Sequence, residues 1–237
     1  MTERVEAVLF DFGGVFTESP FEAARGVGRD LGIDPALMMD TVFGPYDEDT
    51  DHPWHRLERG EIPLVEAHEA ILALGRSRGF EADLFRVLAV LARSGGPRRE
   101  MIERARALRG AGLRTAIVTN NALEFRQTWR VLLPLDELFD AVVDSCEVGF
   151  RKPDPRIFQH TLTLLGGIAP SRALFLDDYE GNLRAARALG MQGVLVNLDP
   201  SSALAALDEL LASRGTGTQQ TAGGSERGSE RGGERGA

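Results

Sequence analysis

Cysteine is almost absent from this chain of 237 residues, which has a single one, Cys146. One thiol cannot form an intramolecular disulfide or supply a cysteine-rich zinc site, so both kinds of scaffold are excluded. A chain without disulfides suits a reducing compartment, and we therefore expect a cytoplasmic protein.

Long apolar runs are missing as well. No stretch of about 18 uncharged apolar residues occurs, so the sequence predicts no transmembrane helix. The first residues, Met1–Val5, lead into a short apolar run and then Asp11, without an apolar stretch followed by a cleavage site. This pattern is not that of a signal peptide.

Positive charge is in deficit, because 27 Lys and Arg face 36 Asp and Glu, for a net charge of −9. This balance argues against a dedicated nucleic-acid binder and against a polybasic membrane-surface protein, since both need clustered Lys and Arg. One or two local cations are enough to bind a small anion inside an acidic protein. We therefore expect a small anionic substrate as the partner, no nucleic acid and no membrane, and a monomer or homodimer.

The C-terminal stretch 213–237 differs in kind from the rest of the chain. Its only apolar residues are Ala222 and Ala237, and it ends in the repeats SERG, SERG and GERG. So few apolar groups cannot offset the entropy of ordering, and we predict a disordered tail. The chain as a whole is 43% apolar, which is enough to build a core elsewhere.

The remainder alternates short apolar runs with amphipathic helical patterns. Short apolar runs of this kind are typical of parallel strands that are covered on both faces. The alternation predicts an α/β fold with a doubly wound, Rossmann-like parallel sheet. The predicted strands cover residues 5–10, 115–118, 141–143, 173–176 and 193–196.

One long gap between the first two predicted strands breaks this alternation. The patterns inside it are helical, so we predict a separate all-helical domain inserted after the first strand, with Gly95–Pro97 as one hinge. The expected boundaries are 1–17 and 96–212 for the core, 18–95 for the helical insert, and 213–237 for the tail. The helical patterns in the insert cover residues 21–31, 36–42, 64–74 and 84–91.

Polar residues follow the predicted strands, at the sheet edge where doubly wound folds bind ligands. Clustered carboxylates repel one another, and a hard cation such as Mg²⁺ relieves that repulsion. Glycines next to the first carboxylate leave backbone amides open to a ligand, and a threonine and a lysine can hold phosphoryl oxygens. An aspartate beside Mg²⁺ can attack phosphorus. These residues are Asp11, Gly13, Gly14, Thr119, Asn120, Asn121, Lys152, Asp177 and Asp178.

Each of these motifs has an ordinary alternative when taken alone. A lone aspartate after a strand is most often a helix N-cap, and Asp177-Asp178 alone could be a solvated turn. All four motifs in order, each near a strand end, argue against a purely structural interpretation.

The motifs resemble those of the haloacid dehalogenase (HAD) superfamily of aspartate-nucleophile phosphohydrolases. Asp11-Phe12-Gly13-Gly14-Val15 is similar to the first motif, and Ile117–Asn121 to the second. Lys152-Pro153-Asp154-Pro155 is similar to the third, and Phe175–Asp178 with the following helix to the fourth. The resemblance extends to about Leu211, and the helical insert matches the family's cap domain. The first motif is similar to a subgroup that includes the N-terminal phosphatase-like domains of epoxide hydrolases and of certain acyl-CoA dehydrogenases.

The resemblance implies a role for each residue. Asp11 would be the nucleophile and a Mg²⁺ ligand, and Gly13 would offer its carbonyl to the metal. Asp178 would bind Mg²⁺ directly, with Asp177 supporting the metal site from behind. Lys152 would neutralise charge between Asp11 and the phosphate. The substrate-binding set that we predict is Thr119, which also counts as catalytic, with Asn120, Asn121, Gly14 and His55.

Gly13 marks a departure from the family. The family's phosphatases usually carry an aspartate at this position as general acid and base, and such catalysis is worth about 10²–10⁴-fold. The predicted cap offers candidates in His52, His55, Glu58 and Glu61, for which a solvated loop and helix end is the first interpretation and substrate contact the second.

Three functions are therefore weighed. The first is a Mg²⁺-dependent hydrolase of a small phosphorylated metabolite that works through an aspartyl-phosphate intermediate. The second is a dehalogenase-type hydrolase, although such members tend to replace the aspartate pair that this chain retains. The third is a non-catalytic binding or regulatory protein that kept the fold after losing the general acid.

Overall fold

A five-stranded parallel sheet forms the centre of the protein, which is described here from a computed structural model covering residues 4–93 and 95–215. Its strands lie in the order β3-β2-β1-β4-β5, and each pairs with its neighbours in parallel register. The doubly wound sheet predicted from the sequence is confirmed, with strand bounds shifted by a few residues. The strands are β1 (Ala7–Phe10), β2 (Arg114–Thr119), β3 (Ala141–Asp144), β4 (Ala173–Asp177) and β5 (Gln192–Leu195).

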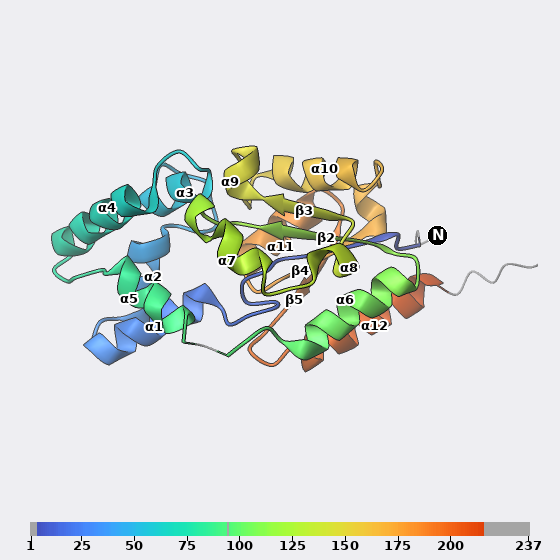
Figure 1. Ribbon diagram of the computed structural model, residues 1–237, viewed down its shortest axis with the longest axis horizontal. Helices are drawn as coiled ribbons and strands as arrows, with labels where there is room; N and C mark the ends of the chain where they lie inside the picture. The colour runs from blue at the N-terminus through green and yellow to red at the C-terminus, as the bar shows by residue number, and fades with distance from the viewer. Residues whose placement is uncertain (1–3, 94, 216–237) are drawn as a thin grey trace, which may run out of the picture.

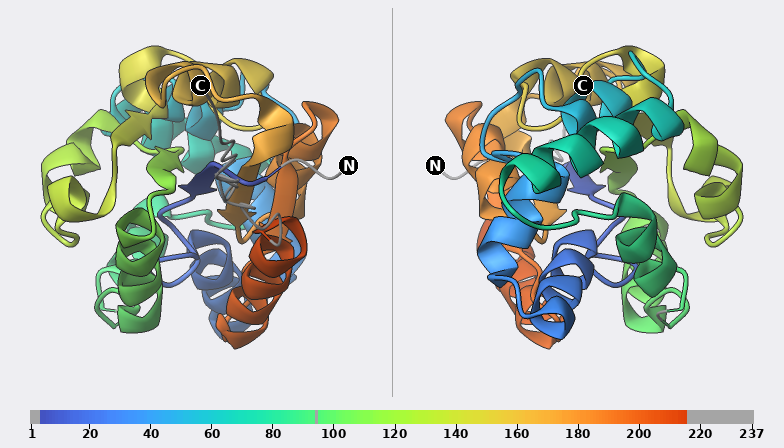
Figure 2. Two further views of the ribbon diagram at one scale, coloured as in Figure 1. Left: turned by 90° about the vertical axis from the view of Figure 1, so that its right-hand side faces the viewer. Right: turned by 90° about the vertical axis from the view of Figure 1, so that its left-hand side faces the viewer.

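Strand β1 is the middle of the sheet and is buried on both sides. Val8 and Phe10 face one apolar cluster, which contains residues of α6 (Arg99–Gly110) and α12 (Ser201–Gly215). Ala7 and Leu9 face the other, with residues of α10 (Pro155–Leu164) and α11 (Glu180–Ala188). Alternate side chains of a strand point to opposite faces, so an unbroken apolar run is what a strand covered on both faces requires. Figure 2 shows α6 and α12 on one side of β1 and α10 on the other.

The segment between β1 and α6 is helical, as the sequence predicted. It has an apolar cluster of its own, separate from the two that cover the sheet. In Figure 1 it lies at one end of the sheet, away from α6 and α12. Two of its helices begin with aspartate N-caps, since Asp34 accepts from the Leu37 amide and Asp83 from the Phe85 amide. We call this segment the helical insert; its helices are α1 (Pro20–Leu31), α2 (Pro35–Phe43), α3 (Pro53–Glu58), α4 (Leu64–Ser77) and α5 (Leu84–Leu91).

Short helices complete the connections between the strands. Two are 3₁₀ turns, Leu123–Phe125 and Pro170–Arg172. Across all helices in the described ranges, none has the length and apolar character needed to cross a membrane. The remaining α-helices are α7 (Arg126–Arg130), α8 (Leu135–Leu138) and α9 (Ser145–Val148).

The predicted tail begins inside a helix. Helix α12 continues to Gly215 and so includes the first three residues of the predicted tail. The rest of the predicted tail, 216–237, lies outside the described residues.

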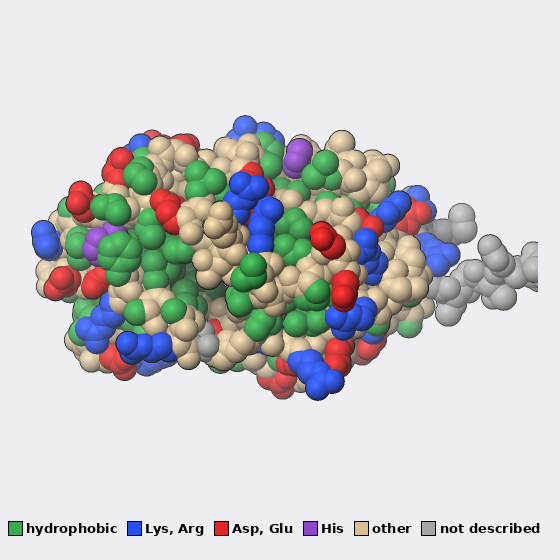
Figure 3. Space-filling view, in the orientation of Figure 1, with side chains coloured by type: hydrophobic (Ala, Val, Ile, Leu, Met, Phe, Trp, Pro, Cys, Tyr) green, Lys and Arg blue, Asp and Glu red, His purple; other side chains and the backbone are tan. Residues whose placement is uncertain are grey.

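Figure 3 shows that basic and acidic side chains are interspersed over the face of the molecule drawn there, without one continuous basic patch.

Candidate active site

Asp11 stands at the carboxyl end of the central strand, on the side of the helical insert. Its Oδ1 accepts hydrogen bonds from the Phe12 amide at 2.6 Å and from Lys152 Nζ at 2.9 Å. The residue as a whole is only 9% exposed. Burial raises the pKa of Asp11 to about 7, with Lys152 opposing the rise and Asp177 adding to it. A carboxylate held in this way is kept ionised mainly by its lysine.

Lys152 bridges two carboxylates beneath the site. Its Nζ lies 2.9 Å from Asp11 Oδ1 and 2.8 Å from Asp177 Oδ2, and the side chain is fully buried. Burial disfavours the charged amine, but the two carboxylates outweigh that effect and the pKa of Lys152 is raised. Lys152 is therefore a fixed positive charge next to Asp11.

Both carboxylate oxygens of Asp177 already accept hydrogen bonds. Besides Lys152, it accepts hydrogen bonds from the Tyr179 amide at 2.8 Å and from Asn182 Nδ2 at 3.1 Å. The side chain is completely buried, and Asp177 is the last residue of β4. Its contacts fit an anchor for Lys152 better than a direct metal ligand.

Asp178, the next residue, has an oxygen to spare. Its Oδ2 accepts from Ser19 Oγ at 2.5 Å, while its Oδ1 is buried and has no hydrogen-bond partner among the described residues. Burial, with Asp177 and Asp11 nearby, raises the pKa of Asp178 well above its usual range. Oxygens of the three carboxylates lie within 4.8 Å of one another. An orphaned buried carboxylate oxygen in such a group fits a hard cation with oxygen ligands, such as Mg²⁺.

The two glycines after Asp11 serve different purposes. Gly14 has φ of +72°, and a Cβ there would lie 2.1 Å from Asp178 Oδ2. A side chain at this position would therefore displace Asp178. Gly13 has no left-handed backbone, and a Cβ on it would meet the Pro20 ring, with Cδ at 3.4 Å and Cγ at 3.7 Å. Gly13 has room for a side chain that the sequence does not supply.

The side chains at the end of β2 point in different directions. Thr119 is buried and lines the cavity over Asp11. Asn120 also lines it, but its side chain holds the backbone of Lys152, with Oδ1 accepting from the amide at 2.7 Å and Nδ2 donating to the carbonyl at 2.9 Å. Asn121 is not among the residues that line this cavity; its Oδ1 accepts from the Ala122 amide. The Asn120 side chain thus positions Lys152. The backbone amide of Asn120 remains available to a ligand.

The cavity over Asp11 is small, about 50 Å³, and the helical insert forms its roof. The roof is largely aromatic, and its rings pack edge to face, with Phe21 and Phe43 centroids 5.5 Å apart and Phe43 and Trp54 centroids 4.8 Å apart. From the core come Asp11, Gly13, Thr119, Asn120 and Asp178, and from the insert Pro20, Phe21, Phe43, Tyr46, Trp54 and Glu58.

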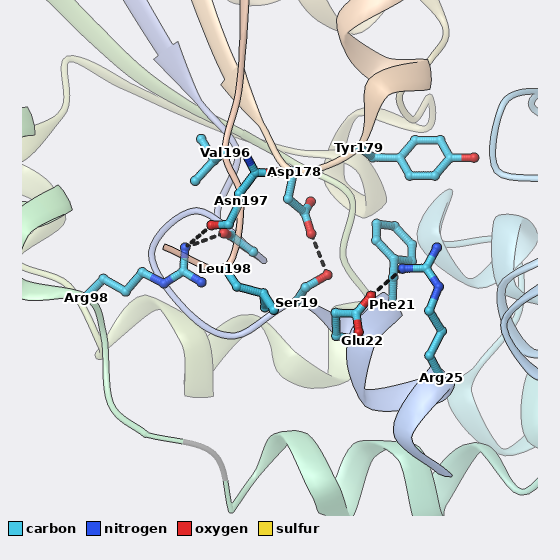
Figure 4. A pocket seen from close by; sticks show the side chains of 11 residues that line it. Ser19, Phe21, Glu22, Arg25, Arg98, Asp178, Tyr179, Val196, Asn197 and Leu198 are labelled. Carbon is cyan, nitrogen blue, oxygen red and sulfur yellow. Dashed lines mark hydrogen bonds and ion pairs between the residues drawn. The ribbon is translucent and has the colours of Figure 1, made fainter. Parts of the chain in front are cut away.

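A second cavity, of about 210 Å³, lies on the other side of Asp178. Figure 4 shows Ser19 pointing to Asp178 across it, with Arg25 and Glu22 paired at one edge and Arg98 reaching toward Asn197. Arg98 is held by the backbone carbonyls of Gly14 and Asn197, so it braces the loop that carries the glycines. Gly14 borders this cavity and not the one over Asp11.

His55 does not reach either cavity. It is fully buried within the helical insert, and its Nδ1 faces the amide and hydroxyl of Thr50. Burial, with Arg151 nearby, lowers the pKa of His55 to about 2, so the ring is neutral. The hypothesis that His55 contacts substrate therefore finds no support in its position. His52 is equally occupied, as its Nδ1 accepts the Trp54 amide at the start of α3.

Glu58 lies at the centre of a network between insert and core. Its Oε1 accepts from the Tyr46 hydroxyl at 2.8 Å, and its Oε2 from Arg151 Nε at 2.6 Å. The Arg151 guanidinium lies 4.4 Å from the centre of the Tyr46 ring, and Tyr46 also accepts from Asn120 Nδ2 at 3.1 Å. Sequence reasoning missed the role of Tyr46. For Arg151, directly before Lys152, the sequence leaves a substrate contact or an ion pair with a carboxylate open, and the structure shows the ion pair, with Glu58.

Residues 5–190 match the family described as haloacid dehalogenase-like hydrolase. The chain is 32% identical to bifunctional epoxide hydrolase 2 of Rattus norvegicus over 92% of its own length, and it spans only 40% of that relative. It is 30% identical to the sesquiterpene phosphatase AstK of Aspergillus oryzae, over 82% of this chain and 91% of the relative. The fold is similar to that of a HAD family enzyme of Bacteroides thetaiotaomicron in complex with magnesium and inorganic phosphate, with TM-score 0.55, 19% identity, and coverage of 82% and 96% of the two chains.

Lys152 bridges Asp11, directly after the central strand, and Asp177, the last residue of the neighbouring strand β4. The chain belongs to the haloacid dehalogenase-like hydrolases.

Proposed function

We propose that the protein is a Mg²⁺-dependent phosphatase that hydrolyses a small phosphorylated metabolite through an aspartyl-phosphate on Asp11. The observation that carries the proposal is the pairing of Asp11 with Lys152 beside an Asp178 oxygen that has no partner. A nucleophile, a fixed cation and a free metal ligand at one strand end are what phosphoryl transfer to a carboxylate needs. The phosphatase among the relatives supports this assignment.

The bound metal ion would be held by Asp11, the Gly13 carbonyl and Asp178, and would supply positive charge for the phosphoryl oxygens. Asp11 attacks phosphorus through Oδ2, since the hydrogen bonds of the described residues go to Oδ1. Lys152 keeps Asp11 ionised and neutralises charge on the incoming phosphate. Thr119 and the Asn120 amide bind the transferring group from the end of β2, and the insert excludes bulk water.

Two alternatives lead to different outcomes in one assay. A dehalogenase would release halide from a 2-haloacid without need of Mg²⁺, and its leaving group needs no proton, which suits Gly13. A binding or regulatory protein would turn over neither substrate. The free Asp178 oxygen and the fixed Lys152 favour phosphate. The domain division 1–17 with 96–212, the cap function of 18–95, a cytoplasmic location, and a monomer or homodimer complete the proposal.

The test is hydrolysis of p-nitrophenyl phosphate with Mg²⁺ and with EDTA, by wild type and by Asp11→Asn. We expect Mg²⁺-dependent turnover that falls to background in Asp11→Asn, because the variant keeps the shape but loses the attacking charge. Acid quench of the wild type should trap phosphate on the peptide that carries Asp11. A variant that keeps more than about a tenth of the rate would refute an aspartyl-phosphate mechanism.

A further inference from the structure

The cavity over Asp11 contains few groups that could donate a proton. Of its lining residues, those with an acidic side chain are Asp11, Tyr46, Glu58 and Asp178. Asp11 is the proposed nucleophile, and Asp178 carries the oxygen proposed for the metal. No histidine is among the described residues that line the cavity. A proton for the leaving group would have to come from Tyr46 or Glu58.

Glu58 is committed as an acceptor on both oxygens. Oε2 receives the Nε proton of Arg151 in a fully buried ion pair, and Oε1 receives the hydroxyl proton of Tyr46. Protonation of Glu58 would leave the guanidinium of Arg151 without its partner in a buried setting, which is costly. Burial raises the pKa of Glu58, while the Arg151 guanidinium and the Tyr46 hydroxyl oppose the rise. The buried ion pair with Arg151 and the two accepted hydrogen bonds favour the carboxylate, which has no proton to give.

Tyr46 is equally unsuited to act as the acid. Its hydroxyl proton already goes to Glu58, and its oxygen accepts from Asn120 Nδ2. Burial and the neighbouring Glu58 carboxylate raise the pKa of Tyr46 well above its usual value. Loss of its proton would place a second negative charge beside Glu58. Gly13, which also lines the cavity beside Asp11, has no side chain to fill the role.

We infer that this site is built for phosphate esters of acidic hydroxyl groups, phenols and enols, whose oxygen leaves without a proton from the protein. The inference rests on the proposed function, because it concerns the first half of that reaction. It narrows the substrate from any small phosphorylated metabolite to one class of leaving group.

The chemical step balances without an acid. Asp11 Oδ2 forms a bond to phosphorus, the bond from phosphorus to the ester oxygen breaks, and the electron pair stays on that oxygen. A phenolate or enolate delocalises this charge and takes up a proton from water after it leaves. An alkoxide cannot delocalise it, so an alkyl ester would leave slowly.

The roof of the cavity fits a flat, unsaturated leaving group. Phe21, Phe43 and Trp54 are among the residues that line it, and an aromatic or enolic group packs on such rings with more gain than a saturated chain. Trp54 is buried, and its indole N–H interacts with the Glu58 carboxylate.

The experiment measures kcat/KM for a series of phosphate monoesters with Mg²⁺, from p-nitrophenyl and phenyl phosphate to benzyl and simple alkyl phosphates. This constant reports the steps through release of the leaving group, whatever the later hydrolysis of the aspartyl-phosphate does. We expect log kcat/KM of the full-length wild type to fall steeply as the pKa of the leaving group rises. A flat plot would overturn the inference, since it would show that the protein supplies a proton.

Gly13→Asp and Gly13→Asn form a matched pair of variants. Only the first can donate a proton, and both have the same shape at a position where a Cβ meets nothing closer than 3.4 Å. We expect the ratio of kcat/KM for alkyl phosphates to kcat/KM for p-nitrophenyl phosphate to rise by about 10²-fold in Gly13→Asp and to stay at the wild-type value in Gly13→Asn. An equal gain in both variants would refute the reasoning. Thermal melts verify that both are folded.

Failure of the proposed function would give a different result in these assays from failure of the inference about leaving groups. If wild type shows no Mg²⁺-dependent release of p-nitrophenol and no acid-stable phosphate on Asp11, the phosphatase assignment itself is wrong. If p-nitrophenyl phosphate is hydrolysed and alkyl phosphates are hydrolysed equally well, the assignment stands and the inference about leaving groups falls.

Discussion

Gly14→Ala is the substitution for which the structure makes the sharpest prediction. The residue has φ of +72°, and the new Cβ would lie 2.1 Å from both Cγ and Oδ2 of Asp178 and 2.6 Å from its Cβ. Asp178 must therefore move, and its hydrogen bond to Ser19 is lost. An alanine in the left-handed region costs about 1–2 kcal/mol, and a hydrogen bond to a charged group about 1.5–3 kcal/mol. We expect Gly14→Ala to lower the free energy of unfolding by about 2.5–5 kcal/mol.

Gly32→Ala is the matched control. Gly32 ends helix α1 with φ of +68°, and a Cβ there would meet nothing within 4 Å. It should lose about 1–2 kcal/mol for the backbone alone. The difference between the two variants isolates the displacement of Asp178.

The assay is urea denaturation of both variants, with EDTA and with saturating Mg²⁺. A ligand that binds only the folded state stabilises it, so Mg²⁺ should stabilise wild type and Gly32→Ala but have little effect on Gly14→Ala. Mg²⁺ titration by calorimetry should show at least about a 10-fold weaker affinity for Gly14→Ala. Equal losses of stability in the two variants, with equal Mg²⁺ affinity, would refute the role given to Gly14.

Three further predictions concern the carboxylates, the buried histidine and the network between insert and core. Asp178→Asn should leave the metal-free protein at least as stable as wild type, because it removes repulsion among the carboxylates, yet it should abolish stabilisation by Mg²⁺. Asp177→Ala removes a buried partner of Lys152 and should lower the free energy of unfolding, measured by urea denaturation, by about 3–5 kcal/mol. His55 has its pKa lowered to about 2 in the folded protein against 6.5 when unfolded, so the unfolded state binds the extra proton and stability should fall by about 1.4 kcal/mol per pH unit below about pH 6. His55→Gln should remove that contribution, and stability curves against pH that run parallel to wild type would contradict the assignment. Glu58→Ala should cost about 3–5 kcal/mol, whereas Glu103→Ala, in an exposed pair with Arg99, should cost less than about 0.5 kcal/mol; similar losses would show that the Glu58 pair is not effectively buried.

The sequence was sufficient for the sheet and for the strand-end residues. A buried parallel strand needs an unbroken apolar run, and a ligand site at a strand end needs polar residues directly after it, so both signals are local. Asp11, Asp177 and Asp178 lie where these signals place them, whereas Lys152 comes from the loop between α9 and α10.

What local signals do not contain is the direction of each side chain. Asn120 and Asn121 are adjacent and chemically identical, and only the turn after β2 decides that one holds Lys152 and the other does not. The same holds in the insert, where His55 and Glu58 are both buried in the short helix α3 but only Glu58 lines the cavity. That outcome depends on how the insert packs against Arg151, far away in the sequence.

The position of β1 has a consequence for how the chain is made. The strand is synthesised well before the two strands that flank it, since Ala7 pairs with Arg114 on one side and with Ala173 on the other. The five helices of the insert are all synthesised before either neighbour, and most of the apolar cluster that they form is local to the insert. During synthesis, therefore, we expect the insert to form first while β1 stays exposed, an apolar segment that a chaperone could bind until β4 closes the sheet.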